Sequence, residues 1–111
     1  MNLEEQIRIA KDITKECDGI MLSKGNDYAN EDRLSNFKLV SQITGLTVSK
    51  VIEVFMATKV VRLGNLSNSD SEPNHESIRD NKIDLINYAR LSIMNDVGSE
   101  EPKEFTKDKD F

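Results

Sequence analysis

The segment from Thr47 to Leu66 constrains the fold most, because apolar residues cover almost every side of it when it is drawn as a helix. Its β-branched residues would also suit a strand, but strands rarely exceed about ten residues. We therefore predict a helix that is apolar nearly all round, and such helices are buried in a core or at a subunit interface. Its apolar residues are Val48, Val51, Ile52, Val54, Phe55, Met56, Val60, Val61 and Leu63.

Three further segments repeat apolar residues every three or four positions, whereas we find no segment that alternates as a strand does. We predict helices over 2–22, 31–44 and 74–96, with Asn2 as the N-cap of the first. The fold class is therefore all-α, with four helices in one small domain. The expected core positions are Leu3, Ile7, Ala10, Ile13, Cys17 and Ile20, then Leu34, Phe37, Val40 and Ile43, then Ile78, Leu85, Ala89 and Ile93.

Glycines and polar runs mark the expected ends of these helices. Gly25, Gly45 and Gly98 each follow a periodic segment, where glycine commonly ends a helix. The polar stretches 23–33 and 67–76 are expected to be connections. Residues 1–97 would then form the domain, and the charged residues 98–111 a disordered tail.

Composition excludes several classes of function. The chain has 111 residues and a formal net charge of −5, which disfavours a surface for nucleic-acid polymers. The single cysteine, Cys17, and the single histidine, His75, exclude an internal disulfide and a zinc site built from those residues. No apolar run approaches the roughly 20 residues that cross a bilayer, and the first residues do not resemble a signal peptide. We expect a cytoplasmic protein without a membrane partner.

Polar residues recur on one stripe of the predicted last helix, at Glu76, Asp80, Asp84 and Asn87. Three carboxylates on one stripe repel one another unless a cation, an arginine or water lies between them. The stripe is either a solvated face or a wall that faces a divalent metal ion or a ligand, because hard cations prefer carboxylate oxygens.

Two cations, Lys59 and Arg62, stand one turn apart in the most apolar segment. A charged residue is seldom buried in a helix unless it is paired. The pair could form ion pairs with Asp80 and Asp84, or it could bind phosphate as a cationic fork. The two roles are compatible, because acids often orient the basic residues of a phosphate site.

The stretch Lys24-Gly25-Asn26-Asp27-Tyr28 has the composition of a tight turn with exposed backbone amides. Tyr28 could stack on a base, and Asn26 or Asp27 could bind the polar edge of that base. The same composition is also common in an ordinary connection between two helices.

Four short sequences occur in order, KGNDYA at 24–29, LSNF at 34–37, ATKVVRL at 57–63 and ESIRDNKIDLINYARL at 76–91. Together they resemble the nucleotide-modification-associated domain 1 family, whose small helical members are common in phages. The family pattern is a D-Y-G/A loop, an N-F pair, a K-x-x-R helix and an E-S-x-x-D-x-x-x-D-L-x-N-Y-A helix. The resemblance implies an oligomeric all-α fold related to the nucleotide pyrophosphohydrolases of the MazG type.

One departure from the MazG-type enzymes bears on catalysis. Those enzymes carry E-x-x-E on one helix and E-x-x-D on a facing helix, and the four carboxylates hold magnesium. Here Lys59 and Arg62 stand where the first acidic pair is expected, and Glu53 is a lone acid on a different face. The resemblance therefore implies nucleotide recognition more strongly than hydrolysis.

The candidate site residues fall into three groups, each read from the residues together with the family pattern. Phosphate binding is assigned to Lys59, Arg62 and Lys24. Base or ribose binding is assigned to Tyr28, Asn26, Asp27 and Asn36. An orienting or metal-binding role is assigned to Glu76, Asp80, Asp84 and Asn87.

The first functional hypothesis is a phage nucleotide-binding protein that sequesters a nucleotide immune signal, such as a cyclic dinucleotide, without cleaving it. It would be a homo-oligomer, a dimer or tetramer, with pockets at subunit interfaces and no required cofactor. The alternative is an enzyme, a Mg²⁺-dependent nucleoside triphosphate pyrophosphohydrolase, or an accessory protein in nucleotide modification. A third hypothesis is a structural helical module whose polar stripes only form ion pairs.

Overall fold

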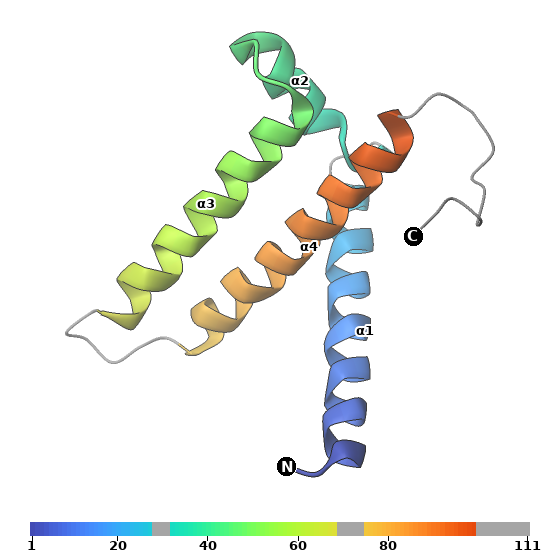
Figure 1. The fold of residues 1–111 in the computed structure, drawn as a ribbon, viewed down its shortest axis with the longest axis vertical. Helices are drawn as coiled ribbons and strands as arrows, with labels where there is room; N and C mark the ends of the chain where they lie inside the picture. Colours follow the sequence, from blue (N-terminus) through green and yellow to red (C-terminus); the bar gives the residue numbers. More distant parts are fainter. Residues whose placement is uncertain (28–31, 69–74, 100–111) are drawn as a thin grey trace, which may run out of the picture.

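The described residues form four helices and no strand. The computed structural model describes residues 1–27, 32–68 and 75–99, with the side chains of 24–27, 75–77 and 99 left out (Figure 1). The helices are α1 (Leu3–Asp27), α2 (Ser35–Thr44), α3 (Val48–Ser67) and α4 (His75–Ser99). The predicted all-α class and its four helices are confirmed.

Local hydrogen bonds explain where three of the helices begin or end. The Asn2 side-chain Oδ1 accepts a hydrogen bond from the Glu5 backbone N–H at 2.8 Å, which confirms Asn2 as the cap of α1. The Thr47 hydroxyl oxygen likewise accepts from the Lys50 N–H at 3.2 Å. Gly45 has a φ of 78° and ends α2, because this left-handed conformation costs glycine little.

The predicted ends at Gly25 and Gly98 are wrong. Helix α1 continues through Gly25 to Asp27, and α4 continues to Ser99. A glycine inside a helix costs only about 1 kcal/mol relative to alanine, and the long preceding helix can offset that cost. Helix α2 also begins at Ser35, later than predicted. The predicted connection 67–76 lies mainly outside the described residues, as does all of the tail beyond Ser99.

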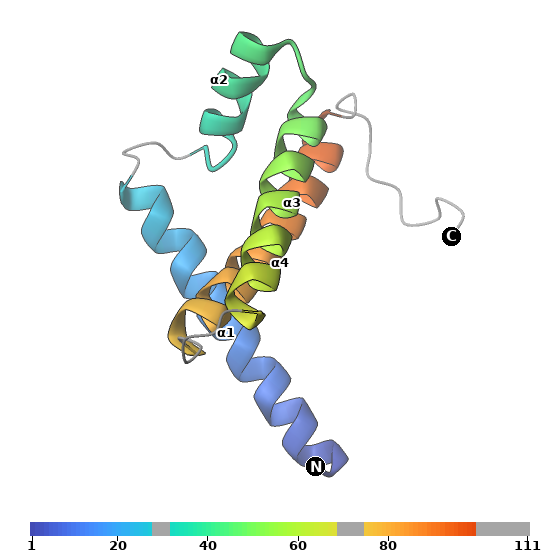
Figure 2. The ribbon, with the colours of Figure 1, turned by 90° about the vertical axis from the view of Figure 1, so that its left-hand side faces the viewer.

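The core lies where α2 meets the α3–α4 pair. Helices α3 and α4 lie side by side over much of their length, and α2 packs against the pair near one end (Figures 1 and 2). Four side chains form the buried centre, namely Phe37, Val51, Ile52 and Leu91. The half-buried side chains around them are Met21, Leu34, Val40, Val48, Phe55, Met56 and Tyr88.

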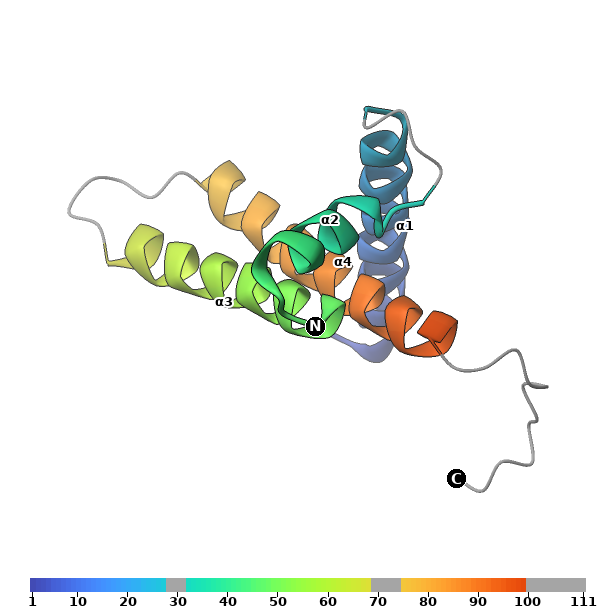
Figure 3. The ribbon, with the colours of Figure 1, turned by 90° about the horizontal axis from the view of Figure 1, so that it is seen from above.

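Helix α1 crosses this pair, and within the described part of the chain the helix that it approaches closely is α4 (Figures 1 and 3). Cys17 is buried at the crossing, and its carbonyl oxygen accepts a hydrogen bond from Asn87 Nδ2 at 3.1 Å. Ion pairs flank it, with Arg79 donating to Glu16 at 2.9 Å and Arg90 donating to Asp18 at 2.7 Å. The contact with Glu16 raises the pKa of Arg79. The N-terminal part of α1 extends beyond α4.

Within one copy of the chain, α3 is covered on one face, and the predicted burial of its other face at a subunit interface stays a prediction. Its inward face holds Val51 and Ile52, but Val54, Val60 and Val61 on the outward face are 52–60% exposed. Other expected core residues are also uncovered, namely Leu3, Ile7, Ile43 and Ile93. Periodicity identifies an apolar face, but neighbouring elements decide which part of it is covered.

Among the described residues, no single helix is long and apolar enough to cross a membrane. Helices α2 and α3 reach that length and apolarity only together, across a bend of 103°.

Candidate functional site

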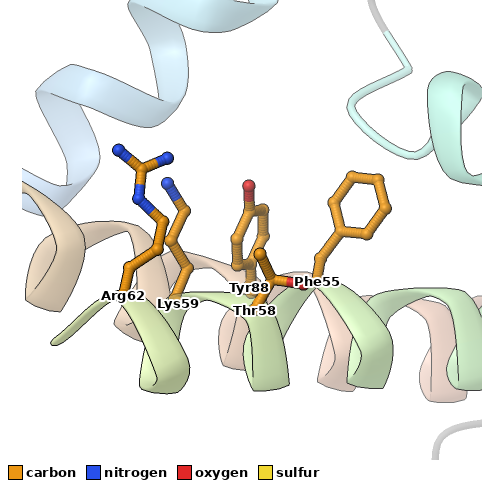
Figure 4. A pocket seen from close by; sticks show the side chains of 5 residues that line it. All are labelled: Phe55, Thr58, Lys59, Arg62 and Tyr88. Atoms are coloured by element: carbon orange, nitrogen blue, oxygen red, sulfur yellow. The ribbon is translucent and has the colours of Figure 1, made fainter. Parts of the chain in front are cut away.

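Lys59 and Arg62 lie at the edge of α3 that faces α4, and they line a pocket of about 240 Å³. The other lining residues are Phe55, Thr58 and Tyr88. In Figure 4 the charged ends of both cations and the Tyr88 hydroxyl point to the same side. The pocket thus combines positive charge, a phenol and aromatic surface on two adjacent helices.

The periodicity of α3 produces most of this arrangement. Thr58 and Lys59 follow Phe55 by three and four residues, and Arg62 follows them by four and three, so the four residues share one side of the helix. Tyr88 lies one turn after Asp84 on α4, so both residues occupy one side of that helix. Phe55, Thr58 and Tyr88 are pocket residues that were not predicted from the sequence. Their spacing from Lys59, Arg62 and Asp84 is the signal that could have identified them.

Lys59 is paired with Asp84, and its Nζ lies 3.0 Å from Asp84 Oδ2. Both side chains are largely buried, with exposed fractions of 16% and 17%. Water therefore screens this pair less than it screens a surface ion pair. The predicted ion pair between the third helix and the acidic stripe is confirmed at this position.

Arg62 is the more accessible cation of the two. No carboxylate within the described part of the chain forms an ion pair with it. A guanidinium presents several N–H donors in one plane and matches the oxygens of a phosphate or carboxylate. Arg62 is therefore the residue in this pocket best placed to bind an incoming anion.

The aromatic side of the pocket is held by edge-to-face ring contacts. The Phe55 and Tyr88 ring centroids are 5.9 Å apart, and the two rings lie 5.3 Å and 6.1 Å from Phe37 on α2. Such contacts orient rings as well as bury them. Helix α2 thereby fixes the position of both aromatic residues beside the two cations.

The hydroxyl groups at the pocket differ in what they can donate. Thr58 Oγ1 donates to the Val54 carbonyl at 2.9 Å, so it can offer a ligand only an acceptor. The Tyr88 hydroxyl forms no hydrogen bond with any described residue. It can therefore donate to a ligand oxygen without breaking an internal bond.

The polar stripe of α4 does not act as one wall. Asp84 contacts α3, Asn87 is only 7% exposed and contacts α1, and Asp80 is exposed. Glu76 lies in the first turn of α4, and its side chain is not described. Within the described ranges, no three His, Cys, Asp or Glu side chains gather as a metal site would require. Asn87 and Asp84 contact different helices, because α4 has two neighbours, and their shared role stays a prediction.

The prediction of a tight turn is wrong for residues 24–27, which are helical, and the base-binding role stays a prediction. Lys24, Asn26 and Asp27 belong to the last turns of α1, where the backbone is helical. Tyr28 lies outside the described residues. Asn36 is exposed in the first turn of α2 and does not appear among the pocket-lining residues.

Comparison with family models, with curated proteins and with solved structures finds no match for this chain.

Proposed function

We propose that this chain binds a nucleotide at the pocket between α3 and α4 and does not cleave it. The observation that carries the proposal is the lining of that pocket, in which Lys59 and Arg62 stand beside Phe55 and Tyr88. Cations attract phosphate, and aromatic rings provide surface on which a base can stack. A nucleotide contains both chemical groups at a short separation.

The charge of the pocket supports binding without hydrolysis. Magnesium-dependent phosphoanhydride cleavage needs several oxygen ligands to hold the metal. The best-placed carboxylate, Asp84, is already occupied by Lys59 at 3.0 Å. In this proposal Asp84 keeps Lys59 in place, and Arg62 makes the first contact with the phosphate.

The size of the pocket favours a site completed by a second copy. Its volume of about 240 Å³ is below the roughly 300–1,000 Å³ of most small-molecule pockets. Val54 and Val61 on the exposed face of α3 lie beside the pocket residues on the helix surface. Our proposal therefore keeps the predicted homo-oligomer, with this face of α3 as an interface next to the pocket.

The biological role in this proposal is that of a phage protein that sequesters a nucleotide immune signal, such as a cyclic dinucleotide. The phage setting rests on the family resemblance. To sequester the signal, the protein must bind the nucleotide and keep it intact. It needs no metal cofactor and no nucleic-acid polymer as a partner.

Calorimetric titration with a panel of nucleotides, in EDTA and then with Mg²⁺, tests the proposal. The wild type should bind at least one nucleotide in EDTA. Arg62→Ala should weaken that binding about tenfold or more, since a charge-assisted contact is lost. Lys82→Ala removes an exposed cation elsewhere on α4 and should leave binding unchanged. Binding that requires Mg²⁺, or equal binding by Arg62→Ala, would contradict this site.

A further inference from the structure

The N-terminal part of α1 extends past α4 (Figures 1 and 2). Apolar side chains in this part, residues 3–14, are exposed to solvent. Leu3 is 71% exposed and Ile7 is 47% exposed. A groove of about 310 Å³ runs over this part of the helix and is lined by Ile7, Ala10, Lys11 and Thr14. Isolated helices of this length are marginal in water, so a partner on this face would stabilise the extension.

The exposed stripe has the spacing of a two-helix seam. Leu3, Ile7, Ala10 and Thr14 follow one another at steps of four, three and four residues, and Cys17 continues the pattern. This is the alternation of a heptad repeat, which gives a narrow seam along one helix. Cys17, the next residue of the stripe, is only 1% exposed, because it lies at the crossing with α4. The stripe therefore has one end that α4 covers and a longer part that is exposed.

The stripe is complementary to itself in the antiparallel direction. A two-fold axis midway between Ile7 and Ala10 sets each Ile7 against Ala10 of a second copy. The same axis sets each Leu3 against Thr14. Large side chains then face smaller ones in every layer, which is how two apolar seams fill space without overlap.

Charges beside the seam favour the same arrangement. Glu4 and Lys11 lie one heptad apart on the same flank of the seam, and they carry opposite charges. Antiparallel pairing brings Glu4 of one copy near Lys11 of the other, and symmetry repeats that contact. In parallel pairing this flank would meet Gln6 and Ile13, which carry no charge.

We propose that residues 3–14 of α1 form an antiparallel helix pair with the same residues of a second copy of this chain. The interface consists of Leu3, Ile7, Ala10 and Thr14, with Glu4–Lys11 contacts on its flank. This interface is separate from the α3–α4 pocket, so the proposal does not depend on whether the pocket binds a nucleotide. A seam this short is typical of the smaller, reversible class of interface.

Sedimentation equilibrium of the full chain over a wide concentration series tests this interface. In a Val61→Asp background, which removes the proposed α3 interface, the chain should still dimerise reversibly through α1. Ile7→Asp should weaken dimerisation at least about 100-fold, because a carboxylate would be buried without a partner. Its far-UV circular dichroism should lose no more than the helical signal of residues 3–14, since Ile7 is not part of the buried core of one copy. Arg8→Glu, a charge reversal outside the seam, should leave dimerisation unchanged.

A charge-swap series tests the antiparallel direction. Glu4→Lys alone and Lys11→Glu alone should each weaken dimerisation about fivefold, and the double variant should restore it. No restoration in the double variant would overturn the antiparallel register. A wild type that stays monomeric would overturn the whole proposal. So would an oligomer that Val61→Asp dissociates and Ile7→Asp does not, because the copies would then meet at α3.

Discussion

The α3–α4 pair and the α1–α4 crossing are held together by different kinds of contact. Apolar side chains and aromatic rings join α3 to α4, with Val51, Ile52 and Leu91 almost completely buried. Ion pairs and one amide hydrogen bond hold α1 on α4, around the buried residues Cys17 and Asn87. Burial of apolar area provides more stability than exposed ion pairs do. We therefore infer that the α3–α4 pair is the rigid part that positions the pocket.

The largest expected difference between the two regions is the effect of removing an apolar side chain. Ile52→Ala should lower the free energy of unfolding by about 2–5 kcal/mol, because Ile52 is 0% exposed and truncation of its side chain leaves a cavity. Ile7→Ala, on the extension of α1, should change it by less than about 0.5 kcal/mol at concentrations where the chain is monomeric. Urea unfolding measures both, and similar losses would contradict the comparison.

The next effect concerns the ion pair beside the pocket. Asp84→Asn should lower the free energy of unfolding by about 1–3 kcal/mol, because Lys59 is only 16% exposed and loses its partner. The same substitution should strengthen binding of inorganic phosphate, because the Asp84 carboxylate no longer competes with phosphate for the Lys59 ammonium group. Parallel unfolding and phosphate titrations measure the two effects. Weaker phosphate binding would show that Lys59 needs Asp84 to hold it in place for the ligand.

A smaller effect is expected at the α1–α4 crossing. Asn87→Ala removes the hydrogen bond to the Cys17 carbonyl and should cost about 1 kcal/mol. The loss should appear as faster hydrogen exchange in α1, with the exchange of α3 unchanged. Asn36→Ala, at an exposed position on α2, is the matched control. Equal acceleration in α1 and α3 would mean that the two regions unfold as one unit.

The smallest effect is the pH dependence at the start of α2. The Lys38 ammonium, 2.6 Å away, and the Leu34 backbone N–H lower the pKa of Asp32. The ionised form is therefore favoured in the folded state, and its contribution is present above the unfolded pKa. That contribution is lost as pH falls through the lowered pKa.

Because both side chains are about half exposed, the contribution should be below about 1 kcal/mol. The measurement is the melting temperature of the wild type and of Asp32→Asn across the acidic range. The difference between them should shrink as the pH falls. A constant difference would show that Asp32 acts through shape and not through its charge.

The sequence predicted the helices well because their apolar periodicity and end signals are local. Asn2, Gly45 and Thr47 act through hydrogen bonds or backbone angles within a few residues of themselves. Gly25 does not end α1, because one glycine destabilises a helix by less than the added hydrogen bonds of a long helix stabilise it.

The candidate site was predicted only in part, because burial depends on neighbours that are distant in the sequence. Lys59 and Asp84 could be paired from the cost of burying a charge. Asn87 could not be separated from Asp84, because only the structure shows that α4 contacts both α1 and α3. In the sequence, Phe55 and Tyr88 cannot be told from ordinary core residues. The structure shows that their contacts with Phe37 hold them beside the two cations.

Recovery of the ligand tests the central claim most directly. Purified protein is incubated with the nucleotide panel and Mg²⁺, separated from free nucleotide and denatured by heat, and the released compounds are identified by mass spectrometry. Our account predicts that a nucleotide is retained and released intact by the wild type and is not retained by Arg62→Ala. Release of a monophosphate together with free pyrophosphate, or no retained nucleotide at all, would contradict it.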